Sequence, residues 1–166
     1  MIILGIDPGS TRVGYGLVKK GTGNAVTLVD CGIIENRLKI LTEKMVHVGM
    51  GIEKILSRFA PDLVAVERLY FSKNQKTALE VAHARGVILF VIKKAGLPII
   101  ELGPGEIKAA VAGYGNADKP AVAKMVKIIL NTEKISGPDD IGDALAVAIA
   151  AAALVNSLKS SPAGPA

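Results

Sequence analysis

The chain has few residues that could cross-link it, bind a soft metal or anchor it in a membrane. Its 166 residues include one cysteine, Cys31, two histidines and no tryptophan. No internal disulfide can form, and no cluster of histidine and cysteine is present. No basic segment followed by an apolar stretch opens the chain, and the apolar run at 141–155 contains an aspartate and is too short to span a bilayer. We therefore expect a cytoplasmic protein with no membrane contact.

The residues that are abundant point to an α/β protein. Half of the chain is hydrophobic but only 4% is aromatic, and the apolar residues are mostly alanine, valine, isoleucine and leucine. Such a composition suits helices packed on a sheet. The length fits one domain, which we expect over residues 1–158, with a disordered tail at 159–166 that is rich in serine, proline and glycine.

The positive charge is concentrated in the middle of the sequence. The net charge is +5, and the segment 67–134 alone holds 11 lysines and arginines against 6 aspartates and glutamates. This distribution predicts a surface that binds a polyanion such as a nucleic acid. A basic face that is merely solvated is the alternative.

The predicted elements are three strands followed by alternating helices and strands. This order is the layout of the RNase H-like fold, a mixed five-stranded sheet flanked by helices. Apolar runs and turn residues predict the strands, and apolar residues at helical spacing predict the helices. The strands are expected at 2–7, 12–19, 25–34, 62–67 and 98–101, and the helices at 41–59, 75–94, 106–111, 120–130 and 139–158.

Two carboxylates are expected to close buried strands. Asp7 ends the first strand and Glu67 ends the fourth. In an α/β sheet, residues at the carboxyl ends of strands face the edge where sites form. Asp7 could instead stabilise the turn at Gly9 and Ser10. Glu67 could instead pair with a neighbouring cation, either Arg68 or Lys73.

Two further carboxylates open the last predicted helix. Asp140 and Asp143 are three residues apart, so they share one face of that helix. Acidic residues at a helix N-terminus also serve as caps, and Asp139 is available for that role. Because apolar residues follow Asp143 directly, we expect its side chain to face packed surface, where an unpaired carboxylate is costly.

These four acids together predict a metal site. Carboxylate oxygens are the ligands that Mg²⁺ prefers, and Mn²⁺ could substitute. Two such ions, roughly 4 Å apart, can activate a water and stabilise the leaving oxygen of a phosphodiester. The sequence contains no Walker A loop and no G-x-S-x-G motif. We therefore predict a nuclease with Asp7, Glu67, Asp140 and Asp143 as catalytic residues and metal ligands.

Five motifs follow one another along the sequence: GIDPGSTRVGYG at 5–16, VERLYFSKN at 66–74, ALEVAHARG at 78–86, GYGNADK at 113–119 and DDIGDALAVAI at 139–149. In this order and spacing the chain resembles the RuvC family of bacterial Holliday junction resolvases, over residues 1–157. The resemblance implies a homodimeric endonuclease of recombination and repair that nicks two strands of like polarity symmetrically across a four-way junction. It assigns the third acid to Asp140 rather than Asp139. It also implies interaction with the branch-migration proteins RuvA and RuvB.

The resemblance also implies residues that contact DNA. Family members place an aromatic residue after the catalytic glutamate to stack on an unpaired base, a position held here by Tyr70 with Phe71 beside it. Lys73, Lys108 and Lys119 are the expected phosphate contacts. The helix that the family uses for dimerisation corresponds to about 78–90, with a face of small and apolar residues: Ala78, Ala82, Gly86 and Leu89.

Three other functions stay open at this point. The segment 5–16 also resembles the first phosphate loop of actin-like ATPases and sugar kinases, but such enzymes need a second similar domain. An RNase H-like nuclease could act on RNA or on RNA–DNA hybrids. A module that binds junctions without catalysis would not depend on Asp7.

Overall fold

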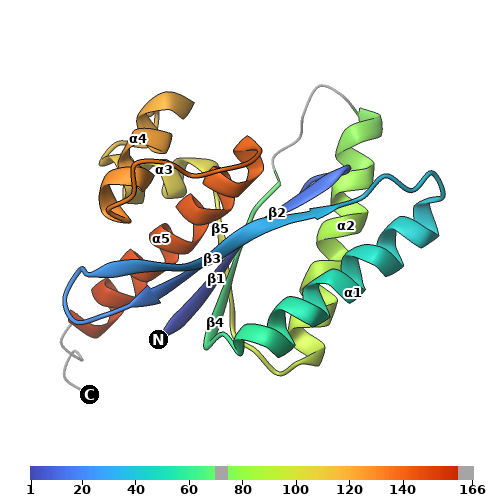
Figure 1. Cartoon of the computed structure of the whole chain (residues 1–166), viewed down its shortest axis with the longest axis horizontal. Helices are drawn as coiled ribbons and strands as arrows, with labels where there is room; N and C mark the ends of the chain where they lie inside the picture. The colour runs from blue at the N-terminus through green and yellow to red at the C-terminus, as the bar shows by residue number, and fades with distance from the viewer. Residues whose placement is uncertain (70–74, 161–166) are drawn as a thin grey trace, which may run out of the picture.

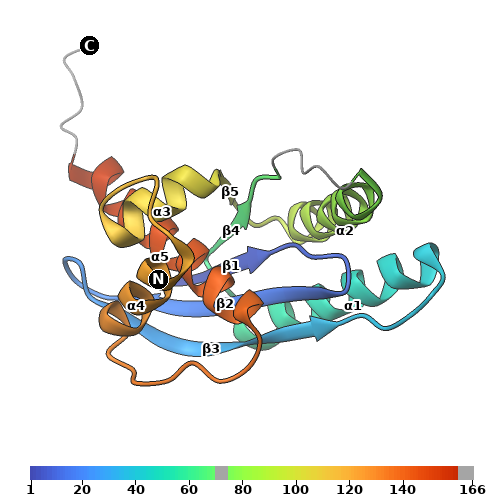
Figure 2. The ribbon, with the colours of Figure 1, turned by 90° about the horizontal axis from the view of Figure 1, so that it is seen from above.

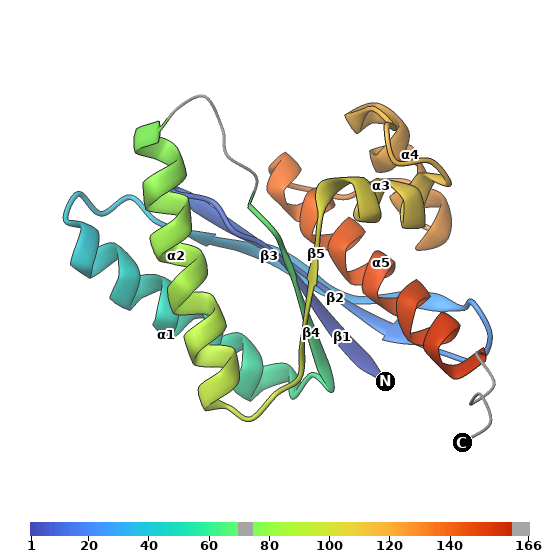
Figure 3. The same cartoon turned by 180° about the vertical axis from the view of Figure 1, so that it is seen from behind.

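The structure, a computed structural model, describes residues 1–69 and 75–160 and contains one five-stranded sheet between two layers of helices. Figures 1 and 2 show α1 and α2 on one face of the sheet and α5, with α3 and α4, on the other. Figure 3 shows the same layers from behind. The strands are β1 (Ile2–Asp7), β2 (Arg12–Lys20), β3 (Val26–Glu35), β4 (Leu63–Glu67) and β5 (Ile99–Leu102). The helices are α1 (Leu41–Phe59), α2 (Gln75–Lys94), α3 (Pro104–Ala112), α4 (Lys119–Ile129) and α5 (Asp139–Ser160).

The strand order is β3-β2-β1-β4-β5. β1, β2 and β3 pair antiparallel, whereas β4 runs parallel to β1 and β5 runs parallel to β4. This is the mixed five-stranded sheet of an RNase H-like fold, as the order of elements predicted.

Most element bounds agree with the sequence prediction. α1 and α2 have the predicted bounds, and Asp118 caps α4 by accepting a hydrogen bond from the Ala121 N–H at 2.8 Å. α5 extends to Ser160, two residues into the predicted tail, and 161–166 lie outside the described residues. No helix in the described part of the chain combines the length and the apolar character that crossing a bilayer would require.

Alternation along the two central strands decides which side chains face α5. In β1, Leu4 and Ile6 pack with α1 and α2, whereas Ile3 packs on the opposite side with α5. Since neighbouring strand residues point to opposite faces, Asp7 lies on the α5 side. The same alternation in β4 places Glu67 on the α5 side as well.

Glycine allows α5 to approach the sheet closely at this end. A Cβ on Gly14 would lie 2.1 Å from the Asp140 carbonyl oxygen, and a Cβ on Gly5 would lie 2.3 Å from the Ala144 carbonyl oxygen. No other residue type fits at either place without moving the helix. The glycines of the segment 5–16 therefore bring the start of α5 beside Asp7.

Candidate active site

Two strand ends supply the first two acids of the site. Ile6 is in register with Val66 across the parallel pair β1–β4. The next residues, Asp7 and Glu67, therefore leave the sheet side by side on the same face. β1 and β4 are buried on both faces up to Ile6 and Val66, so the two acids stand where the buried runs end.

The start of α5 supplies acids in three different environments. Asp143 lines the same cavity as Asp7 and Glu67. Asp140 lies beside them, and its carboxylate pairs with the Arg12 guanidinium at 3.1 Å. Asp139, the first residue of α5, is 83% exposed and pairs with Lys119 at 3.3 Å. Asp140 and Asp143 thus lie on the side of α5 next to the cavity, whereas Asp139 lies on the solvent side.

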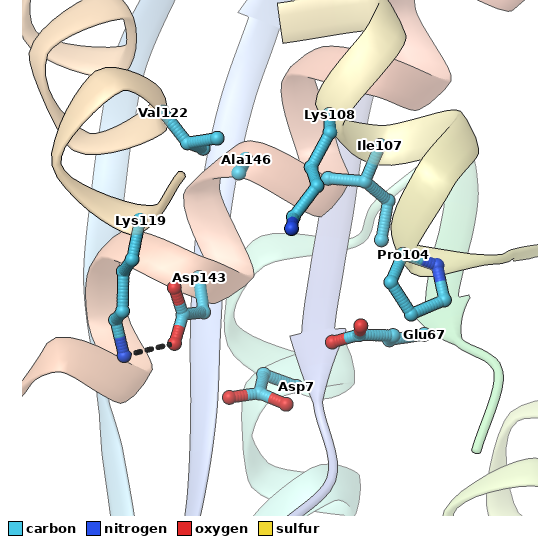
Figure 4. Close-up of a pocket in the computed structure, with 9 residues that line it drawn as sticks. All are labelled: Asp7, Glu67, Pro104, Ile107, Lys108, Lys119, Val122, Asp143 and Ala146. Carbon is cyan, nitrogen blue, oxygen red and sulfur yellow. Dashed lines mark hydrogen bonds and ion pairs between the residues drawn. The ribbon is translucent and has the colours of Figure 1, made fainter. Parts of the chain in front are cut away.

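The acids lie in an open cavity of about 280 Å³ between β1, β4, α3, α4 and α5. Figure 4 shows the side chains of Asp7, Glu67 and Asp143 around this cavity, with Lys119 beside Asp143 and Lys108 reaching in from α3. The Lys119 ammonium is 3.0 Å from an Asp143 oxygen. Apolar side chains complete the lining: Pro104, Ile107, Val122 and Ala146. The cavity therefore combines charged and apolar side chains.

Burial and mutual repulsion perturb the acids strongly. Burial raises the pKa of Asp7 to about 7, and the negative charges of Glu67, Asp143 and Asp140 add to the rise. Burial also raises the pKa of Glu67, and the negative charge of Asp143 adds to this rise. A hydrogen bond with Asp7 acts in the opposite direction. The hydrogen bond to Asp143 raises the pKa of Lys119. The protein therefore concentrates more negative charge here than its own cations neutralise.

This donor set fits a divalent cation that prefers oxygen. Within residues 1–69 and 75–160, no group of three or more acidic, histidine or cysteine side chains is already arranged around a common ion position. Instead, each acid interacts with another side chain of the protein. Asp7 and Glu67 share a hydrogen bond, Lys119 pairs with Asp143, and Arg12 pairs with Asp140. A bound ion would replace these partners and relieve the repulsion that raises the Asp7 pKa.

Some contacts that the sequence suggested do not form, and other predicted contacts lie outside the described residues. The Arg68 guanidinium does not pair with Glu67 but bonds the Glu101 carbonyl at 2.9 Å and the Glu106 carboxylate at 3.0 Å. Arg68 was therefore the wrong partner for Glu67, and pairing with Lys73 stays a prediction. Among the described residues, no hydrogen bond joins the Asp7 carboxylate to the turn at 9–10. The predicted DNA contacts Tyr70, Phe71 and Lys73 lie outside the described residues.

Sequence reasoning missed the partner of Asp140. Arg12 opens β2, next to the turn that follows Asp7. Its only signal in the sequence is its place in the segment 5–16, because ion pairs across 128 residues leave no local pattern.

The fold and the acid cluster place the chain in the class of RNase H-like, metal-dependent nucleases. A family model described as crossover junction endodeoxyribonuclease RuvC matches residues 3–151. The RuvC of Halothermothrix orenii is 47% identical over 152 residues, which are 90% of either chain. The structure of Thermus thermophilus RuvC in complex with a Holliday junction substrate superposes with a TM-score of 0.88 at 32% identity, covering 95% of this chain and 96% of that one.

A more distant structure shares the fold alone. The yeast mitochondrial Holliday junction resolvase has a TM-score of 0.71 at 16% identity. Together, the family model, the curated relatives and the structural similarity show that this chain belongs to the RuvC family of crossover junction endodeoxyribonucleases.

Proposed function

We propose that this protein resolves four-way (Holliday) DNA junctions in recombination and repair by metal-dependent nicking of two strands of like polarity. The observation that carries the proposal is the convergence of Asp7, Glu67 and Asp143 on one cavity, with Asp140 beside it, in a chain of this family. Because its substrate would be chromosomal DNA, we propose that the protein acts in the cytoplasm.

Asp7, Glu67, Asp140 and Asp143 would hold the cation, which we propose is Mg²⁺, two ions in each active site, with Mn²⁺ able to substitute. When bound, such ions supply the Lewis acid that activates water and offsets charge on the leaving oxygen. The chain itself supplies the acids, the apolar part of the cavity lining, and two ammonium groups. Lys108 and Lys119 line the same cavity, where each can contact a phosphate of the strand that enters.

The loop after β4 would recognise the open centre of the junction. Glu67 is the last residue of β4 and lines the cavity, so the segment that follows it in sequence starts beside the active site. Tyr70 and Phe71 are proposed to stack on an unpaired base, which is worth ~1–3 kcal/mol per base, and Lys73 to contact the backbone. Replacing both aromatics with alanine should slow cleavage more than it weakens binding.

We also propose that two copies pair through α2. Leu79 is 61% and Phe90 67% exposed on this helix, and a Cβ on Gly86 would meet no atom within 4 Å. Leu89, assigned to this face from the sequence, packs partly against the core beneath α2, whereas Ala82 is exposed. Exposed apolar groups beside a glycine favour close approach of a second helix. A two-fold axis here would present two active sites to one junction.

Cleavage of matched substrates tests this function. Labelled four-way junction, linear duplex and RNA–DNA hybrid of the same sequence are incubated with Mg²⁺ and either the wild type or Asp7→Asn. We expect cleavage of the junction alone, lost in the variant. Preferred cleavage of the hybrid would support an RNA-directed nuclease, and junction binding without cleavage would support a binding module. The branch-migration proteins RuvA and RuvB are the proposed partners, tested by co-sedimentation on a junction.

A further inference from the structure

A group of charged side chains lies behind Glu67, outside the cavity that holds the acids. Arg85 of α2 donates from Nε to the Glu67 carbonyl oxygen at 3.3 Å, and its guanidinium also pairs with the Glu101 carboxylate of β5. Arg68 donates twice to the Glu101 carbonyl, at 2.9 and 3.2 Å. Glu101 thus accepts from Arg85 through its side chain and from Arg68 through its main chain.

The same group reaches the first turn of α3. Glu106 accepts from Arg68 at 3.0 Å and from the Gly103 N–H at 2.6 Å. The Arg68 N–H donates to the Leu102 carbonyl at 2.7 Å and extends the pairing of β4 with β5 by one residue. Figure 3 shows that β4 and β5 end beside each other, where α3 begins. These bonds join α2, both strand ends and the helix that carries Lys108.

Arg85 is the less exposed of the two arginines in this group. Its side chain is 20% exposed, against 46% for Arg68, so water competes less for its bonds. A planar guanidinium can donate to a carbonyl and a carboxylate at once, which the ammonium of lysine does less well. Glu67 is the last residue of β4. The N–H of the peptide that joins it to Arg68 donates to the Leu102 carbonyl, and the carbonyl of the same peptide accepts from Arg85. Arg85 thus supplies the side-chain bond on the peptide next to the Glu67 Cα, from which the Glu67 side chain reaches the cavity.

We infer that Arg85 is a positioning residue for the metal-binding acid Glu67. It acts through the Glu67 main chain and the Glu101 carboxylate, and it ties the geometry of the active site to α2. The inference rests on the proposed function, because it assigns Glu67 to the metal. It also means that the helix proposed for dimerisation carries a direct link to the catalytic cavity.

The test compares Arg85→Gln and Arg85→Lys with the wild type. Lys94→Gln is the matched control, because Lys94 also belongs to α2 and pairs with Glu53, at 3.4 Å, on the exposed surface. The measurements are the cleavage rate at saturating junction, the junction Kd in Ca²⁺, the Mn²⁺ affinity of the DNA-free protein, and the thermal midpoint. Loss of a residue that orients a metal ligand typically lowers metal affinity or activity by about 10–100-fold.

We expect Arg85→Gln to lower both the Mn²⁺ affinity and the cleavage rate by about 10-fold or more, while the junction Kd changes by less than about 3-fold. Arg85→Lys should restore part of both, and Lys94→Gln should match the wild type. If Arg85→Gln does not fold, the partial loss in Arg85→Lys carries the test. Unchanged Mn²⁺ affinity and cleavage would overturn the inference, as would equal losses in binding, cleavage and thermal midpoint. A wild type that binds Mn²⁺ but cuts no junction would instead contradict the proposed function.

Discussion

Replacing Asp7 with asparagine should stabilise the metal-free protein at neutral and alkaline pH, although it removes a proposed catalytic residue. Burial and the neighbouring acids raise the Asp7 pKa from 3.8 to about 7. Above that pH the folded protein must hold a buried carboxylate next to Glu67, Asp140 and Asp143, whereas the unfolded chain exposes it to water. Asparagine has nearly the same shape and carries no charge, so it relieves the repulsion.

The sign follows from proton binding. Between about pH 4 and pH 7 the folded state keeps the Asp7 proton that the unfolded state has lost, so the free energy of unfolding decreases as pH rises and becomes level above about pH 7. A shift of this size corresponds to at most ~4 kcal/mol at about 1.4 kcal/mol per pKa unit. Because neighbouring acids share the proton and side chains relax, we expect about half of it, ~2 kcal/mol. For a chain of this length that is about 4–8 °C in thermal midpoint.

The assay is thermal unfolding in a chelator at about pH 8 and about pH 5. Glu133→Gln, which removes an exposed acid from the loop after α4, is the control for net charge. Asp7→Asn should unfold several degrees above the wild type at the higher pH, and the difference should shrink by more than half at the lower pH. Added Mg²⁺ should stabilise the wild type and Glu133→Gln but not Asp7→Asn. A variant that is less stable than the wild type at the higher pH would refute the reasoning, as would an equal gain at both.

Three further predictions concern packing, metal competition and assembly. Gly14→Ala should lower the thermal midpoint and the cleavage rate together, because its Cβ would overlap the Asp140 carbonyl oxygen at the start of α5; an unchanged midpoint would contradict the close packing. Arg12→Gln should bind Mn²⁺ more tightly than the wild type in calorimetric titration, because Arg12 competes with the ion for Asp140; weaker binding would show that Arg12 supports the site. Leu79→Glu combined with Phe90→Glu should sediment as a monomer, since both side chains are exposed on α2; an intact dimer would place the interface elsewhere.

The sequence predicted the fold and part of the site because their causes are local. The apolar spacing of 41–59, with a stop after it, determines α1. Asp7 and Glu67 follow apolar runs that become neighbouring parallel strands, so the strand order alone brings them together. The three-residue spacing of Asp140 and Asp143 also put both acids near the site.

The remaining features depend on contacts between distant parts of the chain. Whether Asp140 or Asp143 enters the cavity depends on how closely α5 approaches the sheet at Gly14 and on the pairing with Arg12. Arg68 follows Glu67 directly in sequence, yet the register of β4 with β5 directs it to Glu101 and Glu106. Neither outcome has a periodic or compositional pattern that a sequence could reveal.

The most direct test of the central claim maps the nicks on a four-way junction. Each of the four strands is labelled in turn, and the products formed with Mg²⁺ by the wild type and by Asp143→Asn are sized on a denaturing gel. If the four acids form the active site of a junction resolvase, two opposing strands of like polarity are nicked at corresponding positions, and the variant leaves all four intact. Nicks of equal strength in linear duplex, or nicks that persist in Asp143→Asn, would contradict it.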